Sequence, residues 1–195
     1  WADMGFNYVR IQLSCMDFFN DDITQVDEAE LQELDRIISW ALKYGIHLSI
    51  QFTDYPGHIQ VYELDEENGQ VIADTDFYTN TVKQEQTARL WQTIAKRYKG
   101  IPNNAISFIT NHEPDNPGRS TGTPFDPYTA EDIERVSKYI INAVKEVDSD
   151  RLQFYAPRYN QCGDNYMEGA GAAFVGFNNP QRFIYWNMIN DFSYK

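Results

Sequence analysis

Apolar positions along the chain alternate between short β-rich runs and longer amphipathic runs. Residues 6–13 (FNYVRIQL) are rich in β-branched and aromatic residues and predict a strand. The apolar positions that follow recur at helical spacing: Leu31, Leu34, Ile38 and Ala41 or Leu42. Asp27 and Glu30 form a capping-box pattern before this stripe, and Gly45 stands where a helix would stop. The first unit is therefore predicted to be a strand followed by a helix.

The same alternation continues along the rest of the chain. Further strands are predicted at 46–53, 105–110, 151–157 and 181–189, and further helices at 82–98 and from a cap at Thr129 to Val147. The polar, acidic stretch 58–80 shows neither period and is predicted to be a long, partly ordered loop. Segment 163–176 is ambiguous and is compatible with a short helix.

Strands that alternate with amphipathic helices predict an α/β fold with a parallel sheet and right-handed crossovers. A doubly wound sheet and a closed barrel both satisfy this pattern, although no phosphate-binding glycine turn follows the first strand. The chain has 195 residues and no linker or repeat, so a single domain, 1–195, is expected. A complete (β/α)8 barrel needs roughly 250 residues, or about 200 at the least.

Composition excludes several classes of function. The net charge of −13 argues against nucleic-acid binding, which requires clustered Lys and Arg, and it fits a neutral polysaccharide ligand. Aromatic residues make up 15% of the chain, which fits core packing and also rings that stack on sugars. No apolar run approaches the roughly 20 residues that span a bilayer, and no signal peptide is visible. Because the chain opens on Trp1, we expect the true N-terminus to be missing, and secretion stays open.

Neither a metal nor an organic cofactor is expected. Cys15 and Cys162 are too few for a disulfide framework and are predicted to be free, partly buried thiols. The three histidines, His47, His58 and His112, are too scattered to predict a metal site.

Polar residues gather where the predicted strands end. Ligands of parallel α/β folds bind at the C-terminal ends of the strands, so these residues are candidates for a ligand-facing mouth. The set comprises Asp17, Asp54, His112, Glu113, Asp115, Arg158, Asn187 and Asn190. For each one taken alone, a solvated loop residue is the likelier interpretation, and only the set predicts a polar, ligand-facing mouth.

Glu113 is the sharpest candidate for catalysis. It follows a β-rich run and precedes Pro114, which makes the backbone rigid at that point. Burial and neighbouring charge can raise the pKa of such a carboxyl group until it donates a proton near neutral pH. Cleavage of a glycosidic bond needs that acid and a second carboxylate. A glutamate that merely caps a turn is an equally good interpretation of the local pattern.

Several segments resemble one known family, in the right order and spacing. Residues 103–114 (NNAISFITNHEP) are similar to strand four of glycoside hydrolase family 5, the cellulase and mannanase type, where a Phe-rich strand ends in Asn-Glu-Pro. Residues 90–100 resemble the family's third helix, and residues 5–11 (GFNYVRI) its second strand. Similarities continue at Tyr55-Pro56-Gly57 and at 143–152 (AVKEVDSDRL), so the resemblance covers nearly the whole chain.

The resemblance implies an incomplete (β/α)8 barrel of about five β/α units, corresponding to strands two to six. It implies hydrolysis of a β-linked polysaccharide by a retaining mechanism, with Glu113 as the general acid/base. Arg10 would support the nucleophile, whose counterpart at the end of strand seven is not among these residues. The residues expected to bind substrate are Arg10, His112, Asp54, Arg158, Trp186 and Asn187.

Three positions depart from the family pattern. His112 stands where the family has Asn before the acid, Thr53 where a His is usual, and Asn187-Met188-Ile189 where a His-x-Tyr is usual. These changes favour the rival function of a carbohydrate-binding or scaffold protein that has lost catalysis. A barrel lyase or isomerase would require a metal for which the sequence offers no ligands.

A partial barrel also predicts an association. Five strands leave two sheet edges and much apolar surface uncovered, so self-association or a second chain that completes the barrel is expected. The other expected partner is a polysaccharide or oligosaccharide, and the full-length parent is expected to be secreted or bound at the cell surface.

Overall fold

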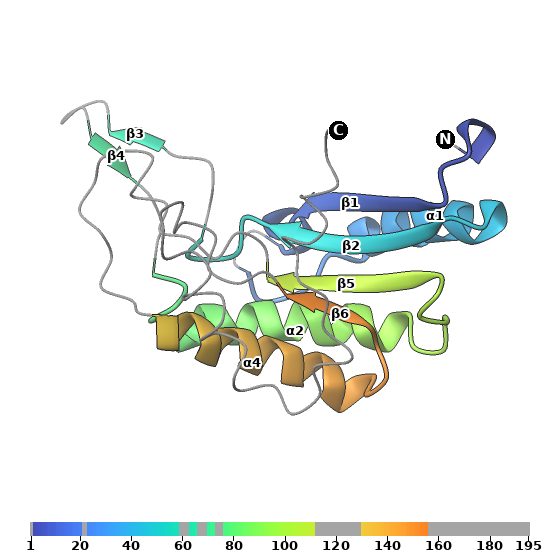
Figure 1. Ribbon diagram of the computed structural model, residues 1–195. Coiled ribbons are helices and arrows are strands. Elements are labelled where there is room, and N and C mark those ends of the chain that lie inside the picture. Colours follow the sequence, from blue (N-terminus) through green and yellow to red (C-terminus); the bar gives the residue numbers. More distant parts are fainter. Residues whose placement is uncertain are drawn as a thin grey trace, which may run out of the picture.

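A computed structural model describes residues 2–20, 23–58, 63–65, 70–72, 76–111 and 130–155. Its centre is a parallel sheet in the order β1 (Tyr8–Ser14), β2 (His47–Thr53), β5 (Ile106–Asn111) and β6 (Gln153–Tyr155), shown in Figure 1. The register pairs Tyr8 with His47 and Ser14 with Thr53, so β1 and β2 start and end together. The strand order follows the chain without a reversal, as it does in a barrel wall.

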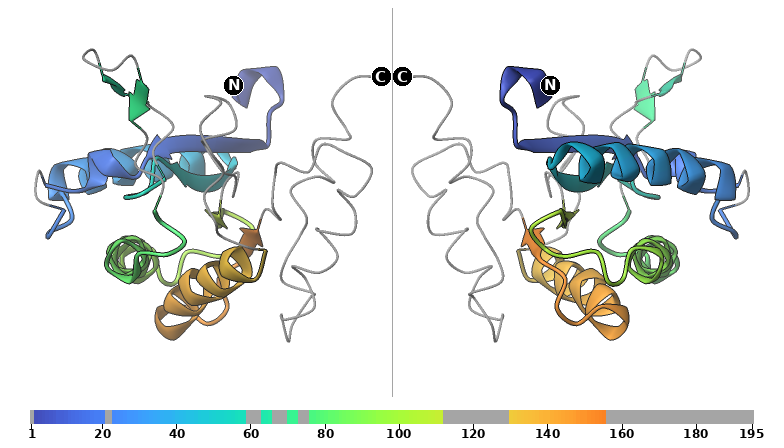
Figure 2. Two further views of the ribbon diagram at one scale, coloured as in Figure 1. Left: turned by 90° about the vertical axis from the view of Figure 1, so that its left-hand side faces the viewer. Right: turned by 90° about the vertical axis from the view of Figure 1, so that its right-hand side faces the viewer.

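The three long helices of the described residues cover one face of this sheet. α1 (Glu28–Tyr44) lies beside β1 and β2, while α2 (Thr81–Arg97) and α4 (Ala130–Val147) run together under β5 and β6 (Figures 1 and 2). Trp91 of α2 contacts both Phe52 and Phe108, with ring centroids 4.9 and 5.3 Å apart. The apolar core between sheet and helices includes Leu34, Ile38, Leu48, Ile50, Ile94, Ile106, Ile133 and Val144. A doubly wound sheet would carry helices on both faces, so the described part has the barrel type of winding.

Alternation along the strands separates an apolar outer face from a polar inner face. On β2, Leu48, Ile50 and Phe52 point toward the helices, while Ser49, Gln51 and Thr53 point the other way. On β1, Val9 and Ile11 pack against the core cluster, while Arg10 and the residues beside it on the inner face are exposed. A helix can bury only the apolar face, so the pattern explains why the described helices lie on one side.

Local signals set the ends of α1 as predicted. The Asp27 carboxylate accepts a hydrogen bond from the Ala29 amide at 2.7 Å, and Gly45 ends α1 in the left-handed conformation at φ 66°. Asn80 caps α2 by accepting from the amides of Val82 and Lys83. α2 begins and ends one residue before the predicted range of 82–98.

Three predictions need correction. The stretch predicted as a long, partly ordered loop, 58–80, contains a short antiparallel pair that the sequence did not predict, β3 (Glu63–Asp65) and β4 (Gln70–Ile72). Cys15 is a free thiol, but it is fully buried rather than partly buried. The predicted strand 151–157 is described only as far as 155, and its β6 begins at Gln153.

Other predicted features lie outside the described residues. They are the cap at Thr129, the ambiguous segment 163–176, the strand at 181–189 and Cys162. The described strands therefore make four parallel β/α-type strands of an incomplete barrel, where the sequence predicted five.

Candidate functional site

The C-terminal ends of the parallel strands meet at one edge of the sheet. Ser14 of β1 pairs with Thr53 of β2, and Asn111 of β5 pairs with Tyr155 of β6. The residue after β1 is hydrogen-bonded to the last residue of β2: the Cys15 amide donates to the Thr53 carbonyl at 2.7 Å. This is the edge at which parallel α/β folds bind their ligands.

Asp54 occupies a strained corner directly after β2. Its φ of 51° lies in the left-handed region, which Asp tolerates better than most residues. The Thr53 hydroxyl lies 3.0 Å from Asp54 Oδ2 and 3.3 Å from the Leu13 carbonyl, and it can donate its single proton to one of them at a time. Backbone strain at the end of a barrel strand is typical of functional positions. Asp54 is therefore held in a fixed place at the C-terminal edge of the sheet.

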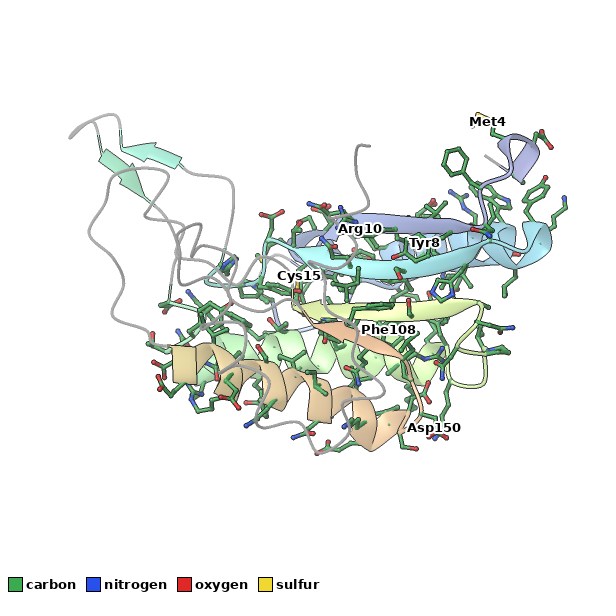
Figure 3. The ribbon with its side chains drawn as sticks, viewed as in Figure 1. Met4, Tyr8, Arg10, Cys15, Phe108 and Asp150 are labelled. Atoms are coloured by element: carbon green, nitrogen blue, oxygen red, sulfur yellow. The ribbon has the colours of Figure 1, made fainter. Side chains whose placement is uncertain are left out.

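Cys15 lies close to this corner but is not a candidate nucleophile. Its side chain, labelled in Figure 3, is fully buried. This burial raises the pKa of the thiol well above its ordinary value. The negative charge of Asp54 raises the pKa further. The thiol therefore stays protonated and packs as a small apolar side chain.

The loop after Asp54 is a rigid turn. The His58 amide donates to the Tyr55 carbonyl at 2.7 Å, and Gly57 has φ 77°, as the third position of a type II turn requires. A Cβ on Gly57 would lie 2.8 Å from the amide nitrogen of Phe77 and 2.5 Å from a carboxylate oxygen of Asp76. The turn thus docks on residues 76–80, which lead into the cap of α2.

Aromatic rings hold the same turn in place. Tyr55 stacks on Phe77 with centroids 5.4 Å apart, and His58 meets Tyr78 edge-on at 6.0 Å. All four side chains are buried. The turn after β2 is therefore already ordered without a ligand. A ligand that bound against it would not lose affinity to the entropy cost of ordering this segment.

The inner face of the sheet carries a column of polar side chains below this edge. His47 Nε2 lies 2.8 Å from Ser107 Oγ, and Ser107 Oγ lies 2.5 Å from Ser49 Oγ. Tyr8 stacks on His47, with centroids 5.5 Å apart. Arg10, which is labelled in Figure 3, lies on the inner face of β1 and is paired in register with Ser49 of β2.

Gln51 lies two residues before the end of β2, on the same face. It is completely buried, and within the described part of the chain neither atom of its carboxamide has a hydrogen-bond partner. Sequence reasoning missed this residue, although the alternation of polar and apolar positions in 46–53 placed it on the inner face.

The predicted site residues divide into two groups. Arg10 and Asp54 both belong to the inner face and C-terminal edge of the sheet, and Asp17 lies exposed in the turn η2 (Met16–Phe18) just after β1. The remaining candidates lie outside the described residues: His112, Glu113, Asp115, Arg158, Trp186, Asn187 and Asn190. Of these, His112 and Glu113 follow Asn111, the last residue of β5, by one and two positions. Their assignment to the site stays a prediction.

The described fold and the strand-end edge define a protein of the (β/α)8-barrel class. Its architecture matches solved structures, including one described as a glycoside hydrolase, with 22% identity and a TM-score of 0.65 over 80% of this chain and 44% of the other. Endoglucanase Cel5A from the hyperthermophilic Thermotoga maritima matches with 17% identity and a TM-score of 0.65, over 94% of this chain and 48% of the other. The Cel5A endoglucanase of Pseudomonas stutzeri matches with 18% identity and the same score, over 94% and 49%.

The sequence identifies the family within this class. The pattern of the family described as Cellulase (glycosyl hydrolase family 5) matches residues 1–185, so the chain belongs to that family. The chain spans slightly less than half the length of the solved structures that it matches. The Thermotoga enzyme has also been solved in complex with mannotriose and with cellobiose. No curated protein matches the chain. None of the described helices is long and apolar enough to cross a membrane.

Proposed function

We propose that this chain is part of a retaining β-glycanase in which Glu113 is the general acid/base. The observation that carries the proposal is the family match over residues 1–185, which includes the Glu113-Pro114 pair just beyond β5. In such an enzyme Glu113 protonates the leaving glycosidic oxygen, and a second carboxylate attacks the anomeric carbon. The water that hydrolyses the intermediate then loses its proton to Glu113.

The proposed substrate is a β-linked polysaccharide or oligosaccharide. Its support is the pair of complexes of the related Thermotoga enzyme, with mannotriose and with cellobiose. The rigid 54–58 turn and Asp54 would form one wall of the sugar site, and Arg10 would act from the inner face. His112, Arg158, Trp186 and Asn187 are proposed to contact the sugar. Residues 1–195 would form one partial barrel domain, and the family match over residues 1–185 supports this.

The test compares two leaving groups in the full-length parent, which would supply the second carboxylate, and in its Glu113→Gln variant. With a cello- or manno-oligosaccharide the leaving alcohol needs a proton, so loss of the acid should reduce the rate about 10²- to 10⁴-fold. With a dinitrophenyl glycoside the leaving phenolate needs no proton, so formation of the intermediate should be nearly unaffected. A purely structural role for Glu113 would reduce both rates equally.

Glu85→Gln is the matched control, because Glu85 is exposed on α2 and the change in charge is the same. It should leave both rates unchanged. Equal rates for Glu113→Gln and wild type on the oligosaccharide would contradict the assignment of Glu113.

A second candidate function is carbohydrate binding without catalysis. It is favoured by Thr53, whose hydroxyl is engaged with Asp54 and the Leu13 carbonyl at a position where the family usually has His. This candidate predicts binding of cello-oligosaccharides by calorimetry with no turnover of either glycoside.

Cellulases of this family are typically extracellular, and we propose the same location for the full-length parent.

A further inference from the structure

The inner face of β2 is polar from one end of the strand to the other. The side chains that point inward are those of His47, Ser49, Gln51 and Thr53. Ser49 and Gln51 are completely buried, and Thr53 is nearly so. The interior of a barrel is usually filled by bulky branched apolar side chains. Polar groups enclosed there are costly unless each has a hydrogen-bond partner.

Three of these four side chains have such partners. His47 and Ser49 both lie within hydrogen-bond distance of the Ser107 hydroxyl, and the Thr53 hydroxyl lies 3.0 Å from the Asp54 carboxylate. Gln51 is the exception: among the described residues, neither Oε1 nor Nε2 of its carboxamide has a partner. One link is therefore missing from a row of hydrogen-bonding groups that otherwise runs along the whole strand.

The neighbouring strands do not satisfy the Gln51 carboxamide. Its register partners are Gln12 on β1 and Ile109 on β5. Ile109 has no polar side-chain atom, and the Gln12 side chain makes no hydrogen bond to Gln51. A carboxamide has two N–H donors and an oxygen that accepts, and burying them unpaired costs their full desolvation energy. Native structures rarely keep such a group without a protein or water partner.

Two small side chains lie next to Gln51 along the strands. Ser49 and Ser107 are paired in register and are both completely buried, with the longer His47 on one side of them and Gln51 on the other. Residues on the same face of a strand are roughly 6.7 Å apart, and a water that bridges two groups spans about 5–6 Å. The Ser49 hydroxyl is bonded to Ser107 alone, so it can still make another hydrogen bond.

We propose that Gln51 and Ser49 bind a buried water molecule on the inner face of β2. Water both donates and accepts, so it can bond to the carboxamide and to the Ser49 hydroxyl at the same time. Two or more such bonds are typical of an internal water that is part of the structure. The water joins Gln51 to the hydrogen bonds of Ser49, Ser107 and His47. The inner face of β2 is then satisfied from its first residue to its last.

The first test is a crystal structure of the full-length parent at a resolution that shows ordered water. A water oxygen should lie about 2.7–3.2 Å from the Gln51 carboxamide and from Ser49 Oγ. A direct hydrogen bond between the carboxamide and another protein group would overturn the proposal. So would a well-ordered Gln51 with no water within that distance.

The second test is the sign of a stability change, measured by urea unfolding of the parent and its Gln51→Met variant. Methionine has a similar volume but no strong hydrogen-bonding group. If water is bound, the variant removes its bonds to the carboxamide, and the ratio of folded to unfolded protein should fall about tenfold. If the carboxamide is unpaired, its removal relieves a desolvation cost and the ratio should rise. A rise, or no change, would contradict the proposal.

Gln25→Met is the matched control, because Gln25 is exposed and undergoes the same chemical change. It should alter the ratio by no more than about twofold. A double-mutant cycle then tests whether Gln51 and Ser49 share the water. Ser49→Ala and Gln51→Met remove partners of one molecule, so the double variant should lose less stability than the two single losses together. Losses that simply add would show that the two side chains do not share a water.

Discussion

Arg151 is the side chain whose removal should damage the fold most. It is 4% exposed and precedes β6, and its Nη2 lies 2.8 Å from the Asp148 carboxylate. The same guanidinium donates to the Tyr98 carbonyl at 3.0 Å and the Ile106 carbonyl at 3.2 Å, and it lies over the Phe108 ring. One cation therefore joins the ends of α2 and α4 to the start of β5.

Replacing Arg151 with Met keeps most of the volume but removes every donor. Asp148, itself only 9% exposed, would keep a charge with no cation beside it, and two carbonyls would lose a charged donor. Breaking a buried ion pair in this way typically costs about 3–5 kcal/mol. Small domains have a total stability of roughly 5–15 kcal/mol, so this variant should lose at least about a fifth of it.

Urea unfolding followed by tryptophan fluorescence would measure the change. The midpoint should fall while the slope with urea stays constant, because the surface exposed on unfolding is similar. Arg151→Lys should fall between wild type and Arg151→Met, since an ammonium keeps the charge but lacks the planar fork of donors. If Arg151→Met costs under about 1 kcal/mol, the reasoning from buried charge is wrong. The double variant Arg151→Met, Asp148→Leu should recover part of the loss.

Two further predictions concern the 54–58 turn and the contact between α1 and α2. Gly57→Ala should destabilise the chain by about 2 kcal/mol or more in the same urea assay, because a Cβ at φ 77° would meet the Phe77 backbone. Gly100→Ala is the control: Gly100 also has a positive φ but open space around it, so this variant measures the cost of the backbone conformation without a steric clash. Asp35 accepts two hydrogen bonds from Arg97, and these bonds lower the pKa of the Asp35 carboxyl. The ion pair therefore stabilises the folded chain fully above about pH 4, and this contribution is lost as the pH falls through the lowered pKa. Asp35→Asn should cost up to about 1 kcal/mol at pH 7 and progressively less as the pH falls through the lowered pKa. A cost independent of pH would exclude this ion pair as the cause.

Features set by neighbouring residues could be predicted from the sequence. The cap at Asp27 and the stop at Gly45 depend on a few adjacent positions, and the structure confirms both. From periodicity alone, a barrel and a doubly wound sheet were equally compatible with the alternation of strands and helices. The family resemblance selected the barrel, and the fold confirms that selection.

Features set by distant residues could not be predicted. Arg151 was read only as the start of a strand, because its carbonyl partners stand 45 and 53 residues away. The β3–β4 pair was missed because each strand has three residues, too few to show a period. The sequence correctly placed Asp54 at the C-terminal end of its strand. The left-handed backbone conformation of Asp54 could not be predicted, because no residue pattern around it indicates one. The roles of Glu113 and His112 stay predictions.

The contacts among His47, Ser107 and Ser49 form a chain of hydrogen bonds with a direction. If the ring proton of His47 is on Nε2, His47 donates to Ser107, and Ser107 donates to Ser49. If the proton is on Nδ1, Nε2 accepts from Ser107, which then accepts from Ser49. The tautomer of one imidazole thus sets the orientation of two hydroxyl dipoles across two neighbouring strands. Nitrogen chemical shifts of His47 would therefore report how the floor of the barrel is polarised.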